Sequence, residues 1–284
     1  MCVLLGALLL AFVADISLVG GLRHSRDQST AYAHLRDALA NSEAPTGQTD
    51  VNGRLLALGT PVALLDIPTI HMHEVIREGT TAGVLVGGPG HLRSTVLPGQ
   101  AGTSVIFGRR AAYGGPFRSI AQLRPGTRVS VTTGQGVQTF LVVDVRRGGD
   151  PVPPLPADPT IAGRVTLVTA AGPAYLPGGL VEVDADLAPN CPQKETAGTC
   201  VQPTPAAVIG PTSLPGSELA LHGDGRALVP LVLWLQAMLL GAVGATWLAL
   251  RRGRSQAWLI GAPIMLLTSL AAADQVARLL PNLM

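Results

Sequence analysis

Side chains able to do chemistry are few in this chain and lie scattered along it. The 284 residues include six histidines and three cysteines. His91 could activate the hydroxyl of Ser94 or Thr169, as the base does in serine hydrolases, if the groups met within hydrogen-bonding distance. His71 and His73, two residues apart on one predicted strand, would share a face and could hold a metal ion. No third ligand accompanies them, so we expect no metal site.

Two of the three cysteines form a second candidate pair. Cys191 and Cys200 lie close together in a Pro- and Gly-rich loop, whereas Cys2 lies in an apolar run. In an oxidising compartment such a pair forms a disulfide, and otherwise it would be two free thiols or half of a metal site. We favour the disulfide. The net charge of +2 provides no basic field for nucleic acid, and we expect no cofactor.

The apolar residues gather at the two ends of the chain. Residues 2–21 and 227–250 are each long enough to cross a hydrocarbon core of about 30 Å, and 257–273 is a shorter third run. Three arginines lie in the loop 251–256, and the positive-inside rule places such a loop in the cytoplasm. A cleaved signal peptide is the alternative for the first run, but it lacks a basic start. We therefore predict a multi-pass membrane protein whose main domain is extracytoplasmic.

The elements that would position these groups are mainly short strands. Between Leu55 and Leu187, β-branched and apolar runs alternate with glycine and proline, which is typical of an all-β barrel or sandwich. The runs are 61–67, 104–107, 128–133, 139–145, 164–169 and 180–186. Gly134 and Gly136 separate two of them and predict a hairpin over 128–145. Apolar residues at helical spacing predict a short amphipathic helix within 25–42.

Several local sequences occur in the order in which they occur in a known family. They are Gly59–Pro68, Glu78–Thr80, Gly88–His91, Leu97–Gly102, Tyr113–Phe117 and Thr166–Thr169. The set resembles the sortase family, the cysteine transpeptidases that join proteins to the cell wall of Gram-positive bacteria. High alanine, glycine, arginine and proline usage is compatible with an actinobacterial member. The resemblance implies a closed β-barrel with short helices, and the apolar runs predict transmembrane helices at both ends of the chain.

Hydropathy, composition and the resemblance together predict a domain division of the chain. The divisions are 1–22 (membrane anchor), 23–53 (juxtamembrane helix and linker), 54–188 (barrel), 189–226 (stalk), 227–250 (membrane helix), 251–256 (basic loop), 257–273 (membrane helix) and 274–284 (outer tail).

The family's chemistry needs a cysteine nucleophile, a histidine and an arginine, and none of them matches here. Arg109 stands at the position of the histidine, Ala170 at that of the cysteine and Gly179, after Gly178, at that of the arginine. Alanine cannot form an acyl-enzyme, and an arginine does not exchange protons near pH 7. The sequence therefore predicts a protein that has lost the catalytic residues.

Four residues remain as candidates for a binding cleft: Arg109, Arg110, Thr169 and His91. A guanidinium there would pair with a carboxylate of a peptide or wall polymer, or else the two arginines make surface ion pairs. We predict a non-catalytic binding or scaffolding module whose partner is a cell-wall-associated peptide or protein, such as an active sortase or a secreted substrate. The alternatives are a transpeptidase with altered activity on sorting-signal peptides and a structural subunit of a membrane complex.

Overall fold

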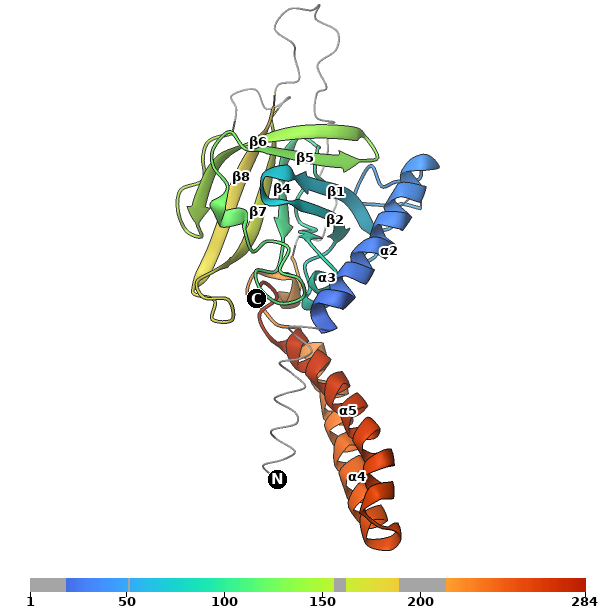
Figure 1. The fold of residues 1–284 in the computed structure, drawn as a ribbon. Helices are drawn as coiled ribbons and strands as arrows, with labels where there is room; N and C mark the ends of the chain where they lie inside the picture. The colour runs from blue at the N-terminus through green and yellow to red at the C-terminus, as the bar shows by residue number, and fades with distance from the viewer. Residues whose placement is uncertain (1–18, 51, 156–161, 189–212) are drawn as a thin grey trace, which may run out of the picture.

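The computed structural model describes residues 19–50, 52–155, 162–188 and 213–284. The predicted N-terminal anchor lies almost wholly outside these residues, and the predicted disulfide between Cys191 and Cys200 lies outside them entirely. Within the described part, a β-barrel carries one helix along its side, and two long helices project away from it (Figure 1).

Eight strands close into a barrel, which confirms the fold class expected for the middle of the chain. Around the barrel the order is β1-β2-β3-β4-β7-β8-β6-β5. The pairs β2–β3 and β4–β7 are parallel, and the other neighbouring pairs are antiparallel. The strands are β1 (Pro61–Ile67), β2 (Met72–Glu78), β3 (Gly90–His91), β4 (Gly102–Phe107), β5 (Arg128–Thr133), β6 (Gly136–Arg147), β7 (Gly163–Ala171) and β8 (Gly179–Leu187).

Short helical segments connect the strands and lead to the long helices. The α-helix α3 (Ala82–Val86) precedes β3, and the 3₁₀ helices are η2 (Pro68–Ile70), η3 (Ile120–Gln122), η4 (Gly216–Glu218) and η5 (Gly225–Ala227).

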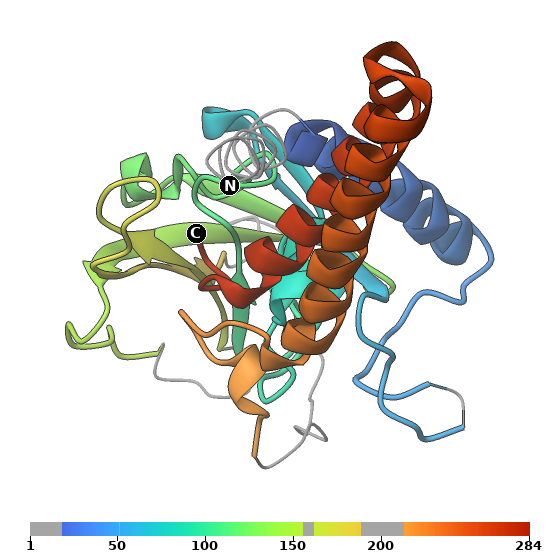
Figure 2. The same ribbon diagram turned by 90° about the horizontal axis from the view of Figure 1, so that it is seen from below.

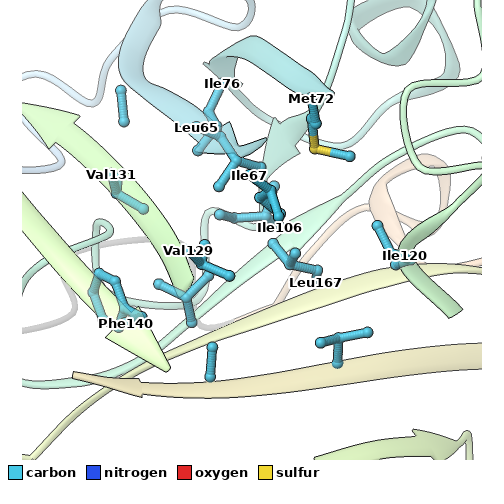
Figure 3. Close-up of a cluster of buried hydrophobic side chains, with 14 of the residues drawn as sticks. Leu65, Ile67, Met72, Ile76, Ile106, Ile120, Val129, Val131, Phe140 and Leu167 are labelled. Carbon is cyan, nitrogen blue, oxygen red and sulfur yellow. The ribbon is translucent and has the colours of Figure 1, made fainter. Parts of the chain in front are cut away.

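The barrel interior is filled by alternate residues of the strands. Figure 3 shows Leu65 and Ile67 of β1 in one cluster with Val131 of β5, Phe140 of β6 and Leu167 of β7. Because successive side chains of a strand face opposite sides, strands such as β5, β7 and β8 supply alternate residues to this core. Burying one such side chain stabilises the fold by about 1.5–3 kcal/mol.

All six runs predicted as strands lie within observed strands. The predicted hairpin is β5–β6, closed where Thr133 pairs with Gly136, and the positive φ of +112° at Gly136 explains the glycine there. The strands β2 and β3 were not among the predicted runs, although His73 was placed on a strand and lies in β2.

One helix, α2 (Gly20–Ala40), runs along the outside of the barrel. It includes most of the predicted amphipathic segment. Ala31 and Leu35 pack against Val75 of β2, and the Gln28 side chain bonds both backbone groups of Val75, with Val75 N–H donating at 2.6 Å and Gln28 Nε2 donating at 3.2 Å. The helix is therefore held to β2 by apolar packing and by side-chain hydrogen bonds.

The two long helices are α4 (Leu228–Arg252) and α5 (Arg254–Leu279), which form an antiparallel hairpin. Gly225–Arg251 and Ala257–Leu279 are each long and apolar enough to cross a membrane. The apolar pattern predicted that the second helix ends at residue 273, but α5 continues to Leu279. Hydropathy marks only the apolar part, whereas Asp274 extends the helix with a carboxylate paired to Arg23 at 2.5 Å and to Arg278 at 3.0 Å.

Candidate functional site

The ends of β4 and β7 bring four of the predicted site positions together: Arg109, Arg110, Thr169 and Ala170. The strands run in parallel, with Phe107 beside Val168. The link continues beyond β4, because the amide of Gly108 donates to the carbonyl of Val168 at 3.0 Å and Thr169 Oγ1 donates to the carbonyl of Gly108 at 2.8 Å. Arg109, Arg110 and Ala170 therefore leave neighbouring strand ends on the same side of the barrel.

A close contact fixes where β4 ends. A side chain at Gly108 would place its Cβ 2.4 Å from the Phe117 ring, so only glycine fits beside that buried aromatic. Phe117 N–H also donates to the carbonyl of Arg109 at 3.0 Å. The stretch that follows β4 is thus folded back over its own strand end, and this carries the side chain of Arg109 inward.

The guanidinium of Arg109 is buried, with 1 % of the residue exposed. Its Nη2 donates to the carbonyl of Ala82 at 3.1 Å, and its Cζ lies 5.0 Å from the centre of the Tyr113 ring. Its Nε has no hydrogen-bond partner within the described part of the chain. Burial lowers the pKa of Arg109 from its ordinary value to about 10, so the group stays charged at neutral pH. The burial of Arg109 counts against both predicted roles, pairing with a ligand carboxylate and forming a surface ion pair. Each of these roles needs a solvent-exposed guanidinium.

Arg110 instead holds backbone groups around Ala170. Its Nη1 donates to the carbonyl of Ala170 at 3.0 Å, and its amide donates to the carbonyl of Leu283 at 3.0 Å. Arg110 therefore connects the end of β7 to the last described residues.

Ala170 itself is 3 % exposed, because other apolar side chains cover it. It belongs to a cluster on the outer face of the barrel with Leu85, Phe107, Val168 and Leu283. Among the residues that the structure describes, no solvent-accessible cleft therefore lies over the position that the resemblance assigns to a nucleophile.

Gly179, matched to the family's arginine, begins β8 opposite Ala171. Its φ of +146° lies in a region that favours glycine, whereas Gly178 has a negative or extended φ and open space around its Cα.

His91 lies on β3, and both nitrogens of its side chain are hydrogen-bonded to residues outside the candidate site. It is fully buried, with Nδ1 2.8 Å from Glu78 Oε2 and Nε2 2.8 Å from the carbonyl oxygen of Val96. Thr169 bonds to Gly108, so these two candidates do not form a base and hydroxyl pair. His91 therefore links β2, β3 and the loop after β3.

The two histidines proposed to share a face do not lie on one strand. His71 precedes β2 with a left-handed φ of +53°, and only His73 lies within the strand. The positive φ breaks the alternation on which the shared face depended. No group of three or more metal-ligating side chains occurs among the residues that the structure describes.

The residues that cover Ala170 were missed by the sequence analysis. Residues 281–284, called the C-terminal segment below, were predicted to belong to a free outer tail, and residues 218–222 to a stalk. Asn282 Nδ2 donates to the carbonyls of Thr80 at 2.9 Å and Leu219 at 3.0 Å. Thr80 Oγ1 donates to the carbonyl of Glu218 at 2.6 Å. The only local signal was an apolar Leu and Met in a tail expected to face water.

Comparison with known proteins identifies the barrel. Residues 65–171 match the model of the family described as Sortase domain. The barrel of this chain is a sortase-like domain. No curated protein sequence matches the chain.

Solved sortase structures are similar to this chain at low sequence identity. The Sortase D5 transpeptidase of Clostridium perfringens is 21% identical, and the match covers 57% of this chain and 99% of that one with a TM-score of 0.45. A mutant sortase E of Streptomyces avermitilis is 29% identical over 47% of this chain and 91% of that one, with a TM-score of 0.40. The SrtA sortase of Actinomyces oris is 25% identical over 51% and 87%, with a TM-score of 0.42.

Proposed function

We propose that this protein is a non-catalytic sortase-like module, anchored in the cell membrane and exposed on its outer face, that binds or scaffolds a peptide or protein of the cell envelope. The observation that carries the proposal is the environment of Ala170. At the position matched to the family's nucleophile there is a methyl group, and Leu283 packs over it. Neither residue has a group that could attack a carbonyl carbon.

The surroundings of Ala170 support the same conclusion. The cation of Arg109 is buried and stays protonated at neutral pH, so it cannot act as the general acid or base that this position needs. Because residues of a catalytic set act as a unit, loss of the nucleophile alone removes most of the rate.

The helical hairpin supports the membrane part of the proposal. Apolar side chains of α4 and α5 are exposed along most of their length, among them Leu239, Leu240, Trp258 and Leu259. The loop 251–256 lies at the tip of the hairpin, far from the barrel (Figure 1). With that arginine-rich tip in the cytoplasm, the hairpin crosses the bilayer twice and leaves the barrel outside.

The catalytic part is tested with the full-length chain in detergent. The substrate is a fluorogenic Leu-Pro-x-Thr-Gly peptide with hydroxylamine as acceptor, and the matched variant combines Arg109→His, Ala170→Cys and Gly178→Arg. Position 178 is preferred for the arginine because of the strained φ at Gly179. We expect no turnover by the native chain. Turnover by the native chain that persists after repurification would reveal a nucleophile elsewhere and refute the proposal. The protein would then be interpreted as a transpeptidase with altered activity.

The topology is tested by cysteine labelling in intact cells. In a chain with Cys2, Cys191 and Cys200 changed to serine, Val137→Cys on the barrel should react with an impermeant maleimide. Gly253→Cys at the hairpin tip should react only after the cells are permeabilised. The reverse pattern would place the barrel in the cytoplasm and rule out an envelope partner.

The small residues of the hairpin bear on the alternative of a membrane-complex subunit. A Cβ at Gly241 would lie 3.2 Å from the Ile264 side chain, and one at Gly261 would lie 2.9 Å from Ala245 Cβ. These contacts lie between α4 and α5 themselves. The close approach therefore serves the hairpin, and it does not favour a separate partner helix.

A further inference from the structure

The connection between β7 and β8 is an apolar turn with an exposed tip. Residues 172–178 read Gly-Pro-Ala-Tyr-Leu-Pro-Gly and contain no charged side chain. Tyr175 is 48% exposed and Leu176 is 73% exposed, although both are large apolar residues. Single exposed apolar side chains are common on protein surfaces, but two adjacent ones at the tip of an uncharged turn form a patch that suits an apolar partner.

Backbone contacts hold this turn in one shape. The amide of Leu176 donates to the carbonyl of Pro173 at 3.1 Å, and the amide of Gly178 donates to the carbonyl of Ala171 at 2.9 Å. Gly172 has a φ of +97°, and a Cβ there would lie 3.0 Å from the carbonyl oxygen of Leu176. The turn is therefore ordered before any partner binds, so binding at its tip costs little chain entropy.

The same turn lies at the end of the barrel from which the helical hairpin projects. Leu283 of the C-terminal segment follows shortly after the end of α5 and packs in one cluster with Val168 and Ala170, near the end of β7. Figures 1 and 2 show the connection between β7 and β8 at that end of the barrel. The tip of the turn therefore lies near the level at which the apolar span 257–279 ends.

The turn between β5 and β6, away from the hairpin, has the opposite character. Residues 133–136 read Thr-Gly-Gln-Gly and are polar. Gln135 Nε2 donates to the carbonyl of Thr46 at 3.2 Å, in the stretch that follows the C-terminal end of α2, whereas Arg23 near the start of α2 pairs with Asp274 of α5. The length of α2 therefore separates the polar turn from the hairpin. Of these two turns, the one on the hairpin side is apolar, as expected where a barrel faces lipid.

We infer that Tyr175 and Leu176, at the tip of the turn between β7 and β8, insert into the outer leaflet of the membrane that anchors the chain. The inference rests on the proposed membrane anchoring and adds a lipid contact made by the barrel itself. Tyrosine suits the interface because its ring is apolar while its hydroxyl reaches the headgroups, and leucine adds apolar area. Held by the hairpin and by this turn, the barrel keeps one orientation, with the ends of β4 and β7 turned toward the bilayer.

Quenching by labelled lipids tests the contact in the full-length chain. The chain has its three cysteines changed to serine, carries a small fluorophore on Ala174→Cys, an exposed position of the turn, and is placed in phosphatidylcholine nanodiscs. A nitroxide on the upper lipid tails should lower the fluorescence at least about twofold, because interfacial segments bury their apolar face about 5–10 Å into the headgroup boundary. The same label on Val137→Cys, an exposed apolar position of β6, should not be quenched. No quenching at position 174, or equal quenching at both positions, would overturn the inference.

Charged substitutions decide whether the two side chains themselves make the contact. In the chain labelled at position 174, Tyr175→Asp combined with Leu176→Asp should reduce quenching to the level of the label at position 137, because moving a carboxylate out of water is costly. Val137→Asp in the same chain is the matched control and should leave the quenching unchanged. Both turn residues are exposed, so the barrel keeps its core, and the corresponding pair of serine substitutions serves if the aspartates unfold the chain. Quenching that persists in the substituted chain would overturn the insertion.

A label in the hairpin separates this inference from the proposed membrane anchoring. Leu259→Cys, at an exposed position of α5, should be quenched whether or not the turn is substituted. If position 259 is quenched and position 174 is not, the anchoring stands and the insertion of the turn is wrong. If neither position is quenched, both proposals fail. Adding phosphatidylglycerol should leave the quenching at position 174 unchanged, since the turn carries no charge, and quenching that requires this anionic lipid would overturn the inference.

Discussion

The backbone amide of Arg110 donates a hydrogen bond to the carbonyl oxygen of Leu283, with an N···O distance of 3.0 Å. Arg110 follows β4, and Leu283 follows α5 at the far end of the chain. The bond therefore ties the helical hairpin to the strand end at which the family resemblance expected catalysis. Four predictions follow from other contacts of the barrel and the hairpin.

The first prediction concerns the charge on Arg109. Arg109→Met should leave the free energy of unfolding within about 1 kcal/mol of the native value or raise it, because the desolvation cost disappears with the charge. Arg109→Ala should lower it by about 2–5 kcal/mol by leaving a cavity. Chemical denaturation of both variants gives the comparison. If Arg109→Met lowered the free energy of unfolding as much as Arg109→Ala does, the cation would have to have an anionic partner.

The same residue makes stability depend on pH at the alkaline end. Burial in the folded chain lowers the pKa of Arg109 from its ordinary value, which the unfolded chain keeps, to about 10. Between these values the unfolded chain binds more protons than the folded one, so the contribution of Arg109 to the free energy of unfolding rises with pH. Below the folded-state pKa of about 10, Arg109 is protonated in both the folded and the unfolded chain, so its contribution does not change with pH. The difference between the native chain and Arg109→Met should therefore be flat from pH 6 to 9, and a slope there would contradict the assignment.

The second prediction assigns His91 a structural role. His91→Leu should lower the free energy of unfolding by about 3 kcal/mol, because the buried carboxylate of Glu78 loses its partner. His73→Leu is the matched control, since its imidazole contacts Asp66 at 3.2 Å at the surface, and it should change stability by less than about 0.5 kcal/mol. Thermal unfolding of the two variants distinguishes them. Equal changes in stability in the two variants would show that the pair of His91 with Glu78 contributes nothing to the free energy of unfolding.

The third prediction tests the ion pairs between β6 and β8. Arg146 Nε lies 2.6 Å from Asp184 Oδ2, and Asp184 is fully buried and also accepts from Thr166 Oγ1 at 2.7 Å. Burial opposes the charge of Arg146, but the carboxylates of Asp184 and Glu182 outweigh it and raise the pKa of Arg146. Arg146→Met should lower the free energy of unfolding by about 3–5 kcal/mol, because it leaves a buried carboxylate without its cationic partner.

The same contacts predict a second substitution that restores part of the stability lost in Arg146→Met. Adding Asp184→Asn should recover part of the stability, since a neutral amide still accepts from Thr166. Arg128→Met, at an exposed position of β5, serves as the control in denaturant titrations. No recovery in the double variant would mean that the loss comes from packing of the arginine stem.

The fourth prediction concerns the helical hairpin. A Cβ at Gly261 would lie 2.9 Å from Ala245 Cβ, whereas one at Gly244 would meet nothing within 4 Å. Gly261→Ala should therefore destabilise the hairpin by about 1–3 kcal/mol in detergent, and Gly244→Ala should not. Helix content followed during thermal unfolding provides the measurement. Equal midpoints would show that the helices separate readily at this contact.

The sequence predicted the barrel well because its signals are local. Pro61–Ile67 shows alternating apolar residues bounded by turn residues, and the structure has a strand with those bounds. Gly134 and Gly136 likewise marked a turn that only glycine-rich sequences adopt easily. The β2 strand was harder, because its start at Met72 follows a left-handed His71 that no alternation rule anticipates.

The candidate site was predicted in part. The motifs assigned Arg109, Arg110, Thr169 and Ala170 to one candidate site, and the structure brings them together at the ends of β4 and β7. They could not show that the side chain of Arg109 is buried beneath Tyr113, because side-chain direction depends on how the stretch after Gly108 folds back. His91 was misplaced for the same kind of reason. Its partner Glu78 lies on another strand, and sequence spacing does not reveal such contacts.

By itself the sequence determined the strand-rich barrel, two helices apolar enough to span a membrane, and an alanine where the resemblance expects a nucleophile, since each of these depends on local residue types. Only the tertiary structure decided that Leu283 and the 218–222 loop cover Ala170. That contact joins segments far apart in the chain. It depends on where α5 ends relative to the barrel and on the cross-chain bonds of Asn282, and no local pattern encodes either.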